Sequence, residues 1–455
     1  MGALAVTAAC APLEGPGETV VEPIPIPPET QLAGDPQRGW SFLVNGNYID
    51  CGVPETLYRQ LYGAADAPLR LEGRDDANAD LPYNLNAFTS SRGNRVVHPN
   101  CLSCHASVFR GQLVVGLGAS EADFTKDATQ GLNGVERFLS GTARQEFDFW
   151  YEHVSAVAPH IRAAVVGVNT ADALGVALAS HRDPSTLAWS DTALFDLPAG
   201  DPLPVDVPPW WRAKKKSSLY ATGAGRGDHS RLMMLASTMC VDSVDVARTI
   251  ADVFPDVRAA ITEISPPAWP GTVDSGMVTT GQAVFETQCA RCHGDASTYP
   301  NLFLPLELVG TDGALAQQSV ANAPYLAWVG SSFYGETARM EPGLGYTAPP
   351  LDGVWATAPF LHNGSVPTME ALLDSSKRPE RWRRRDDLGD HGYDDAAVGW
   401  HYDAVDANTY EGLGPNDKTH VYDTNRTGYG NGGHTFGDEL TSDERASVIE
   451  YLKTL

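Results

Sequence analysis

Apolar residues recur with helical spacing in two long stretches of the first half of the chain. Residues 134–168 and 230–264 both show this spacing, and in the second stretch apolar side chains stand at i, i+3, i+7 and i+14 from Leu232. Pro255 falls inside that stretch, where a proline is expected to kink or end a helix. Alternation of apolar and polar residues, which marks a half-buried strand, does not extend over any convincing length. The pattern predicts a mainly α protein with little β structure.

Two more helices are predicted near the ends of the second half. Residues 279–289 form a short helix with Thr279 as its N-cap candidate. Thr441 and Glu444 have the spacing of a capping box, and apolar residues of a final helix follow them. Between the two helices, residues 412–437 are rich in Gly, Asn and Asp and are predicted to form a long loop. Ordered loops of this length usually have a function.

These patterns divide the chain into three parts. Residues 1–35 read as a leader and linker, residues 36–270 as a first domain and residues 271–455 as a second domain. A proline-rich run at 202–211 separates the two helical stretches of the first domain. The 44 glycines and 32 prolines indicate long ordered loops rather than a helical bundle with short connections.

The charge balance is strongly acidic, with a formal net charge of −25. Such a surface repels nucleic acid and anionic lipid headgroups and favours cationic partners. The basic runs at 214–216 and 381–385 are read as solvated faces. No run of apolar residues approaches the ~18 that a membrane-spanning helix needs. We therefore expect no nucleic-acid partner.

Four of the seven cysteines belong to two copies of the pattern Cys-x-x-Cys-His. A zinc site or a redox Cys-x-x-Cys pair does not explain a histidine directly after the second cysteine in both copies. Covalent haem c does, because two thiols attach to the porphyrin vinyl groups and the adjacent imidazole becomes the proximal iron ligand. The residues are Cys101, Cys104, His105, Cys289, Cys292 and His293. The sequence therefore predicts two covalently bound haem c groups.

Haem c is attached outside the bacterial cytoplasm, so we expect an exported protein. Small apolar residues precede Cys10, as at the end of a lipoprotein signal, although no basic segment precedes them. Cys10 would then carry a lipid, and residues 21–28 would tether the protein to the membrane; an ordinary disordered N-terminus is the alternative. Cys51 and Cys240 remain, and an oxidising compartment permits a disulfide between them, although the sequence does not place them within bonding distance.

One segment carries a family resemblance. Residues 346–368 read YTAPPLDGVWATAPFLHNGSVPT, which resembles the signature of the bacterial di-haem cytochrome c peroxidase and MauG superfamily. The His362-Asn-Gly-Ser form is most similar to the rubber oxygenase (RoxA)-like branch, as are the segments 378–382, 393–400 and 431–437. The resemblance covers roughly residues 80–120 and 200–455. It implies two cytochrome c-type haem domains; polymer cleavage is not implied, because this chain is much shorter than rubber oxygenases.

The resemblance also bears on the second axial ligand of the second haem. In the RoxA-like branch a C-terminal histidine takes this position, which here implies His434. Met340 is the alternative, at a plausible spacing for a His/Met cytochrome, and His362 and Tyr346 are weaker candidates. Peroxidases use a methionine shortly beyond the His-Asp-Gly segment, and residues 370–377 contain none.

Candidate reactive residues lie between the two motifs. Small residues surround Arg226, Asp228 and His229. Peroxide chemistry needs a base, which His229 or Asp228 could supply, and a cation, which Arg226 could supply. The plainer reading is that Asp228 caps the following helix and that Arg226 pairs with a haem propionate. Superfamily members place a tryptophan between the haems as an electron relay, which implies Trp211 or Trp210; aromatic packing is the alternative.

The leading hypothesis is a periplasmic di-haem oxidoreductase, with one six-coordinate relay haem and one accessible haem that reacts with hydrogen peroxide. A small electron-donor protein or a protein substrate would be the reductant. Dioxygen insertion, as in rubber oxygenases, and pure electron transfer by two six-coordinate haems are the alternatives. The resemblance also allows Ca²⁺ between the domains, although no spaced Asp/Asn motif appears.

Overall fold

The computed structural model describes residues 21–455 except 76, 128, 131 and 296. In it 41% of the residues are helical and 13% lie in strands, so the fold is mixed α and β. The prediction of a mainly α protein with little β structure is therefore wrong. The strands that were missed are two to five residues long and form several sheets of two or three strands. Strands this short do not carry enough alternating positions to be recognised in the sequence.

The first half of the chain contributes eight helices and seven strands to the part that the structure describes. In chain order they are β1 (Ile24–Pro25), α1 (Pro36–Asn45), β2 (Val53–Pro54), α2 (Glu55–Tyr62), β3 (Leu85–Thr89), β4 (Arg95–Pro99), α3 (Leu102–His105), β5 (Ala106–Phe109), β6 (Gln112–Val115), α4 (Gly141–Val157), α5 (Ala171–Ser180), β7 (Gly225–Gly227), α6 (His229–Met233), α7 (Val244–Ala251) and α8 (Phe254–Glu263).

The second half continues with short elements and ends on a helix. In chain order they are α9 (Ser275–Gln288), α10 (Ala290–His293), β8 (Leu302–Pro305), α11 (Leu306–Val309), α12 (Ala314–Ala321), α13 (Ala323–Ser331), β9 (Ala338–Met340), β10 (Gly345–Thr347), α14 (Met369–Leu373), β11 (Arg381–Arg384), β12 (Tyr393–Asp394), β13 (Gly399–Trp400), β14 (Tyr402–Ala404), α15 (Ala407–Gly412), α16 (Pro415–Lys418), β15 (Tyr422–Asp423) and α17 (Ser442–Leu452). No helix in the described part of the chain is long and apolar enough to cross a bilayer.

The stretch 230–264 is helical, as its apolar spacing predicts, but it is broken into several pieces. It consists of α6, the 3₁₀ segment Met234–Cys240, α7 and α8. Pro255 does not end a helix; it lies in the first turn of α8, where its missing N–H group costs nothing. The helix predicted over 279–289 begins earlier, with Asp274 rather than Thr279 as its N-cap. The capping box of Thr441 and Glu444 is confirmed.

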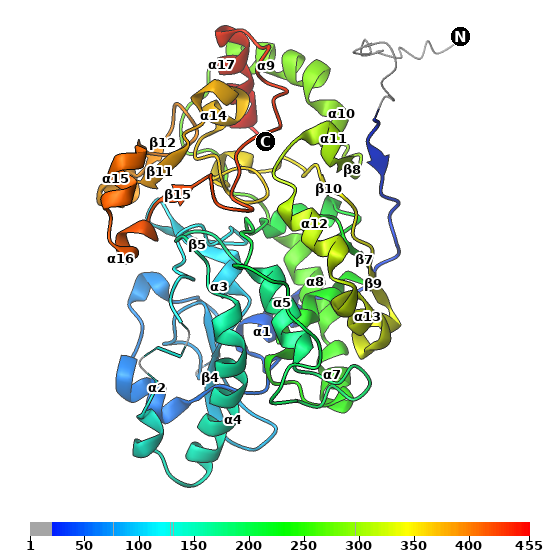
Figure 1. Cartoon of the computed structure of the whole chain (residues 1–455), viewed down its shortest axis with the longest axis vertical. Coiled ribbons are helices and arrows are strands. Elements are labelled where there is room, and N and C mark those ends of the chain that lie inside the picture. The colour runs from blue at the N-terminus through cyan, green and yellow to red at the C-terminus, as the bar shows by residue number, and fades with distance from the viewer. Residues whose placement is uncertain (1–20, 76, 128, 131, 296) are drawn as a thin grey trace.

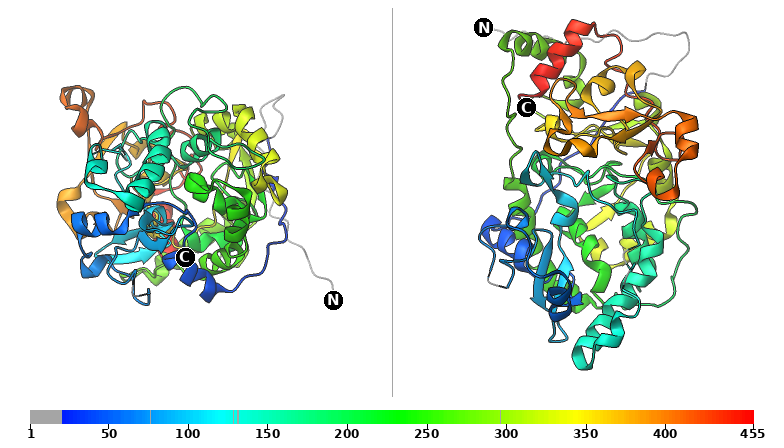
Figure 2. Two further views of the ribbon diagram at one scale, coloured as in Figure 1. Left: turned by 90° about the horizontal axis from the view of Figure 1, so that it is seen from below. Right: turned by 90° about the vertical axis from the view of Figure 1, so that its left-hand side faces the viewer.

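The first and last helices of the second half cross, as in a cytochrome c. Helices α9 and α17 pack closely, and the rings of Phe285 and Tyr451 lie 5.2 Å apart. A Cβ atom on Gly281 would lie 1.9 Å from the carbonyl oxygen of Ser447, so only glycine allows this approach. In Figure 1 this pair lies at the top of the molecule, and Figure 2 shows that the first half occupies the opposite end.

Part of the second half completes the core of the first. Trp328 on α13 is buried and its Nε1 donates a hydrogen bond to the carbonyl oxygen of Arg182 at 2.7 Å. Strand β9 pairs with β7, so that Ala338 lies opposite Gly227. Figure 1 shows α13 and β9 low in the molecule, beside elements of the first half. Segments on both sides of residue 270 thus pack in one hydrophobic cluster.

The proline-rich run at 21–28 is packed against the protein instead of forming a free tether. Ile24 in β1 lies opposite Phe303 in β8, and the backbone N–H of Ile26 donates to the carbonyl of Asn301 at 2.8 Å. Further along, Glu29 forms an ion pair with Arg339 at 2.8 Å. The expectation of a tether over these residues is wrong, because β-pairing satisfies their backbone. Cys10, the proposed lipid site, lies outside the described residues.

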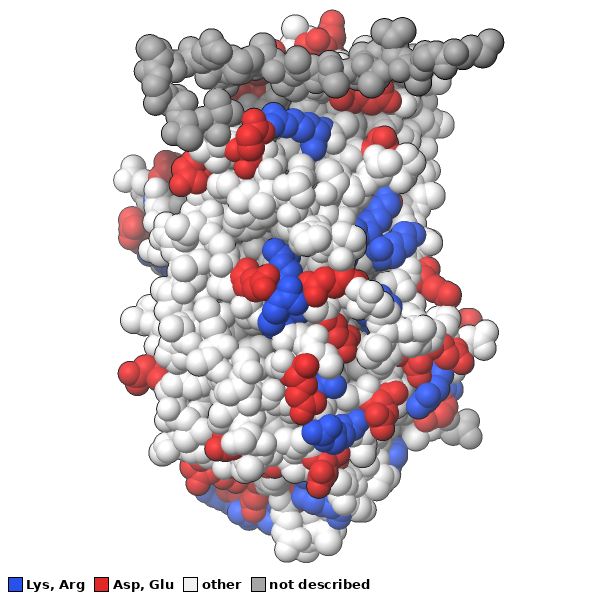
Figure 3. All heavy atoms as spheres, turned by 90° about the vertical axis from the view of Figure 1, so that its right-hand side faces the viewer, with Lys and Arg blue, Asp and Glu red and all other residues white. Residues whose placement is uncertain are grey.

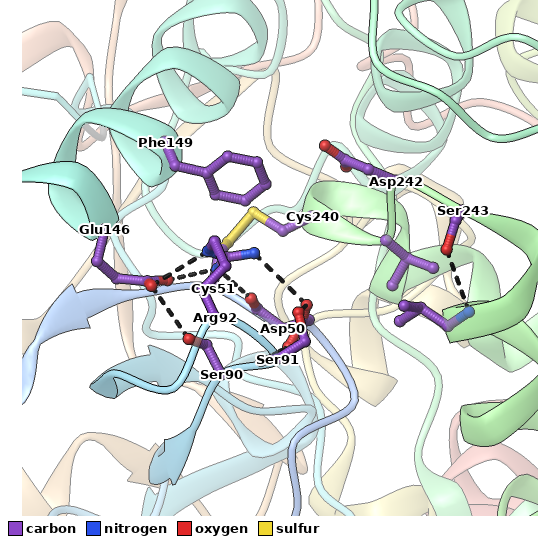
Figure 4. A network of polar contacts seen from close by, with 12 residues as sticks. Asp50, Cys51, Ser90, Ser91, Arg92, Glu146, Phe149, Cys240, Asp242 and Ser243 are labelled. Carbon is purple, nitrogen blue, oxygen red and sulfur yellow. Dashed lines mark hydrogen bonds and ion pairs between the residues drawn. A yellow bond between two sulfur atoms is a disulfide. The ribbon is translucent and has the colours of Figure 1, made fainter. Parts of the chain in front are cut away.

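Cys51 and Cys240 form a disulfide, with a Cα–Cα distance of 5.7 Å. Both residues are buried, and a polar network surrounds the bond (Figure 4). Asp50 accepts hydrogen bonds from the backbone N–H and the hydroxyl of Ser91, while Arg92 forms an ion pair with the fully buried carboxylate of Glu146. The network ties the β3–β4 turn to α4.

We expect the double variant Cys51→Ser/Cys240→Ser to lose about 2–5 kcal/mol of unfolding free energy, because the bond closes a loop of 189 residues in the unfolded chain. Urea denaturation with and without dithiothreitol measures this loss. The reductant should destabilise the wild type and leave the double variant unchanged; equal sensitivity in both would contradict the assignment.

Candidate functional site

The second Cys-x-x-Cys-His motif opens onto a cavity of about 360 Å³. Cys289, Cys292 and His293 line it from the junction of α9 and α10, and His362 and His434 line it from loops further along the chain. Burial raises the pKa of Cys289 to about 11 and also raises that of Cys292, so both sulfurs are neutral thiols. Two thiols and three imidazoles therefore converge on one largely apolar space.

The rings of His293 and His434 face each other across this cavity, with their centres 6.2 Å apart. The Nδ1 atom of His293 lies 2.8 Å from the carbonyl oxygen of Pro349, which leaves Nε2 for the cavity. Burial lowers the pKa of both residues, to about 4 for His434, so both are neutral and able to ligate a metal. The buried Nδ1 of His434 has no hydrogen-bond partner among the described residues.

This spacing fits an iron between the two imidazoles. A metal–imidazole bond is about 2.0–2.1 Å long and the ring centre lies about 1.2 Å beyond the nitrogen, so two rings on opposite sides of one metal have centres about 6.4–6.6 Å apart. The observed 6.2 Å is within a few tenths of an ångström of this range. Cys289 and Cys292 line the same cavity, as covalent haem attachment requires. The residues present therefore fit a haem c with His293 and His434 as its axial ligands.

Arg378 fixes the loop that carries His434. Its guanidinium donates five hydrogen bonds of 2.6–3.1 Å to backbone carbonyls, which belong to Ala371, Leu372, Asn431, Gly433 and His434. All five N–H donors of the side chain are thus used. Burial lowers the pKa of Arg378, but a guanidinium keeps its charge. One side chain thereby joins α14 to both ends of the histidine loop.

The loop needs an unusual backbone at this point. Gly433 and His434 have φ angles of 70° and 46°, in the left-handed region. A Cβ atom on Gly433 would lie 2.1 Å from the carbonyl carbon of Gly310, so the loop can pass there only as glycine. The N–H of His434 then donates to the carbonyl of Val309 at 2.7 Å.

His362, in the segment that carries the family resemblance, stacks on Tyr346 with a centre distance of 3.9 Å. Burial lowers the pKa of His362 to about 3, and its Nε2 has no partner in the described part of the chain. The next residue, Asn363, is fully buried and donates to the carbonyls of Gly428 and Gly430 at 2.9 Å. His362 thus lines the cavity, while Asn363 fixes the segment behind it.

Two cations in this cavity were missed by the sequence analysis. Arg212 and Lys216 line it, and burial lowers the pKa of Arg212 to about 10 and that of Lys216 to about 8. Asp206, a third lining residue, has its pKa raised well above the ordinary value by burial. Neither cation has a carboxylate within ion-pair distance among the described residues, so both fit haem propionates. The run at 214–216 is therefore not only a solvated face.

The first motif lies in the other half of the molecule. The N–H of Cys101 donates to the Tyr48 hydroxyl at 2.9 Å, and the Asn169 amide donates to Sγ of Cys104 at 3.2 Å. Burial raises the pKa of Cys104 to about 11 and lowers that of His105 to about 4. The ring of Trp210 stacks on His105 with a centre distance of 4.8 Å. Again, two neutral thiols and a neutral imidazole are brought together.

Trp210 and Trp211 connect the two halves. Trp210 packs in the cluster beneath the first motif, with Leu102 and Ala106. Trp211 is fully buried in the core of the second half, and its Nε1 donates to the carbonyl of Asp352 at 2.7 Å. Adjacent indoles thus lie in separate cores. This arrangement suits both packing and electron transfer between the sites.

The residues expected at the first reactive centre lie in different environments. Asp228 caps α6 by accepting from the N–H of Ser230 at 3.0 Å, and Arg226 lies 3.7 Å from Glu341. His229 is buried, its Nε2 has no partner among the described residues, and burial lowers its pKa to about 4. Among the described residues, Nε2 of His229 and one terminal nitrogen of Arg226 are both buried without a hydrogen-bond partner, whereas Asp228 is used by the helix cap.

Met340, the alternative ligand, does not line the cavity of His293. It lies opposite Gly225 in the β7–β9 pair and packs against the core of the first half. Within the described residues, no group of three or more His, Cys, Asp or Glu side chains is close enough together to hold a bare metal ion, and the Ca²⁺ that the resemblance allows stays a prediction.

One carboxylate and two phenols from distant segments interact in a partly buried region and gave no sequence signal. Burial raises the pKa of Asp172 to about 6 and is also the main cause that raises the pKa of Tyr220 and Tyr325, to which the Asp172 charge adds. Asp172 lies in the first turn of α5, shortly after Asn169, the residue that contacts Cys104. The three side chains come from distant segments, so only the fold brings them together.

Comparisons with known proteins agree with this chemistry. A family model described as RoxA-like, cytochrome c-like matches residues 345–383. Uncharacterized protein y4iJ of Sinorhizobium fredii (strain NBRC 101917 / NGR234) is 29% identical over 293 residues, which cover 49% of this chain and 47% of y4iJ. Uncharacterized protein y4iM of the same strain is 27% identical over 295 residues, which cover 55% of this chain and 64% of y4iM.

The family match contains His362 and Arg378 but neither of the Cys-x-x-Cys-His motifs. It links this chain to cytochrome c proteins and supports covalent haem c and a haem-based oxidoreductase. The chain spans about half the length of y4iJ and less than two thirds of y4iM.

We expect Arg378→Gln to lower the unfolding free energy by at least about 2 kcal/mol, because buried carbonyls lose charged donors. Arg383→Gln is the matched control, since Arg383 donates one 3.3 Å bond to the Asp417 carbonyl and should change stability by less than about 0.5 kcal/mol. Urea denaturation measures both. In the haem-loaded protein, only the Arg378 variant should lose low-spin signal; equal effects would show that Arg378 does not hold the loop.

Proposed function

We propose that this protein is a di-haem c oxidoreductase that reduces hydrogen peroxide, with an electron-relay haem at the second motif and a reactive haem at the first. The observation that carries the proposal is the pair of neutral imidazoles, His293 and His434, whose centres lie 6.2 Å apart across one cavity. Two strong axial ligands favour electron transfer over substrate binding at that site.

Bound haem would supply an iron that changes its oxidation state and, where a coordination position is open, binds peroxide or dioxygen. The chain would hold it through Cys289 and Cys292, while Arg212 and Lys216 pair with its propionates. At the first motif, Cys101 and Cys104 would attach a haem and His105 would ligate its iron. The indole of Trp210 stacks on the face of the His105 ring and so positions this imidazole.

In this proposal His229 takes the first proton from peroxide, because its neutral, buried imidazole has a free nitrogen. Asp228 and Arg226 support it structurally, through the α6 cap and the contact with Glu341. Trp210 and Trp211 carry electrons between the two sites. A dioxygen-dependent reaction is the second candidate, and the match of residues 345–383 to a RoxA-like family favours it.

We propose a location outside the cytoplasm, in the periplasm or at the cell surface with a lipid on Cys10. The two haem-attachment motifs and the Cys51–Cys240 disulfide support an oxidising compartment. The net charge of −25 favours a cationic electron-donor protein or protein substrate over nucleic acid. On the face seen in Figure 3, acidic and basic side chains are interspersed between wide uncharged areas, so this face carries no field of one sign.

The spin state of the ferric protein tests the proposal. Electron paramagnetic resonance should show one low-spin and one high-spin haem, and two low-spin signals would overturn the reactive role of the first. His434→Gly should convert the low-spin haem to high spin, because a strong nitrogen ligand is lost. Met340→Ala is the control and should leave both signals unchanged; the opposite result would assign the ligand to Met340.

Peroxide kinetics test the role of His229. Because a general base typically contributes ~10²–10⁴-fold, His229→Ala should slow the peroxide-induced change in the Soret absorption at least about tenfold in stopped flow. The control is His160→Ala, which alters an exposed imidazole. If both variants react like the wild type, His229 has only a structural role. A wild type that ignores peroxide but consumes dioxygen would favour the second candidate.

A further inference from the structure

A second cavity of about 470 Å³ lies where the two halves meet. We call it the Arg384 groove; its lining comes from residues 108–123 and 165–168 of the first half and residues 359–422 of the second. Its volume falls within the usual range of small-molecule sites, about 300–1,000 Å³. None of its lining residues is used by the proposed function.

Aromatic side chains make up much of the groove wall. Trp382, Tyr393, Trp400 and Tyr422 all line it. The guanidinium of Arg384 lies over the Trp400 ring, 3.2 Å from its centre, and the Trp382 and Tyr422 rings stack with planes only 9° apart. These ring faces are therefore already covered, and a small aromatic ligand would meet ring edges, together with Val108 and Val166, in edge-to-face contacts.

The charges of the groove are already paired with one another. Arg384 forms an ion pair with Glu121, and Arg110 forms one with Asp395 at 2.5 Å. Arg385 pairs with Asp387 at 2.8 Å. Each arginine therefore has a carboxylate, so an ionised ligand would gain no unpaired partner. An uncharged ligand with a hydrogen-bonding hydroxyl suits the groove better, because oxygens such as those of Asp123 can accept from it.

The groove is close to the second candidate haem site. Pro359 lines the Arg384 groove and also the cavity of His293, and the next residues, Phe360 and Leu361, line that cavity too. One segment of backbone therefore separates the two spaces. An electron donor in the groove would lie one residue layer from the relay site.

A chain of aromatic rings also leads inward from the groove. Trp400 lies 5.2 Å from Tyr393, Tyr393 lies 5.1 Å from Phe109, and Phe109 lies 5.8 Å from Trp355, all between ring centres. Trp211 belongs to the same buried cluster. Contacts between aromatic rings thus extend from the groove wall into the core that contains Trp211, next to Trp210 and the first motif.

We propose that the Arg384 groove binds an uncharged phenol and uses it as the electron donor. This inference rests on the proposed function, which supplies hydrogen peroxide as the oxidant. Each phenol loses one electron to the oxidised protein and its hydroxyl proton to water or a groove carboxylate, and leaves as a phenoxyl radical. Two phenols and one hydrogen peroxide thus give two phenoxyl radicals and two waters.

Guaiacol is a suitable uncharged phenol as a probe. Substitutions on two different segments can each fill the groove. Ser120→Phe and Val166→Phe each place a ring in the groove, and Ser331→Phe on the exposed end of α13 is the matched control. Calorimetric titration of the ferric holoprotein without peroxide measures binding. Both groove variants should raise the Kd for guaiacol at least tenfold and the control should not, with thermal unfolding used to verify folding.

With peroxide, both groove variants should raise the KM for guaiacol oxidation at least tenfold. The peroxide-induced Soret change, measured without guaiacol, should keep its wild-type rate. Wild type that does not bind guaiacol, or groove variants that bind it like the wild type, would overturn the proposal. If guaiacol binds in the groove but is not oxidised with peroxide, the binding site stands and the peroxidase function fails.

Discussion

The second candidate haem site depends on one half-buried guanidinium. Arg378 donates to five backbone carbonyls, three of which belong to the loop that ends at His434. A buried carbonyl without a donor costs about 1–3 kcal/mol, so this one side chain offsets several such costs. It also allows a left-handed turn at Gly433 and His434 that the chain would otherwise disfavour. Without these hydrogen bonds, the loop would lose the contacts that hold His434 opposite His293.

The two motifs follow one physical rule although they lie in different halves. In each, burial keeps the thiols and the imidazole uncharged, which is the form that haem attachment and ligation need. The sites differ in the residue next to the imidazole. His293 lies opposite His434 across a cavity, while Trp210 covers the face of the His105 ring. The second site thus supplies the second imidazole on which its proposed relay role rests.

The halves are interlocked by segments that cross between them. Trp328 and Ala338 enter the core of the first half, while Trp211 enters that of the second. The segment 21–35 pairs with β8 and contacts Arg339. A disulfide adds a further constraint within the first half. Relative motion of the two sites would break buried contacts, so the distance between them is held constant.

The sequence by itself determined the chemistry of attachment, because Cys-x-x-Cys-His is a local pattern whose spacing carries its function. It also predicted the helices that became α9 and α17 and the Thr441 capping box, which depend on neighbouring residues. The short strands, the disulfide and the packing of residues 21–28 were decided by tertiary structure, since each needs a partner far along the chain. For the same reason only the fold assembled Arg212 and Lys216 beside the cavity, Arg378 on the histidine loop, and the aromatic groove between the halves. Local spacing shows which groups can react, whereas long-range packing decides which of them meet.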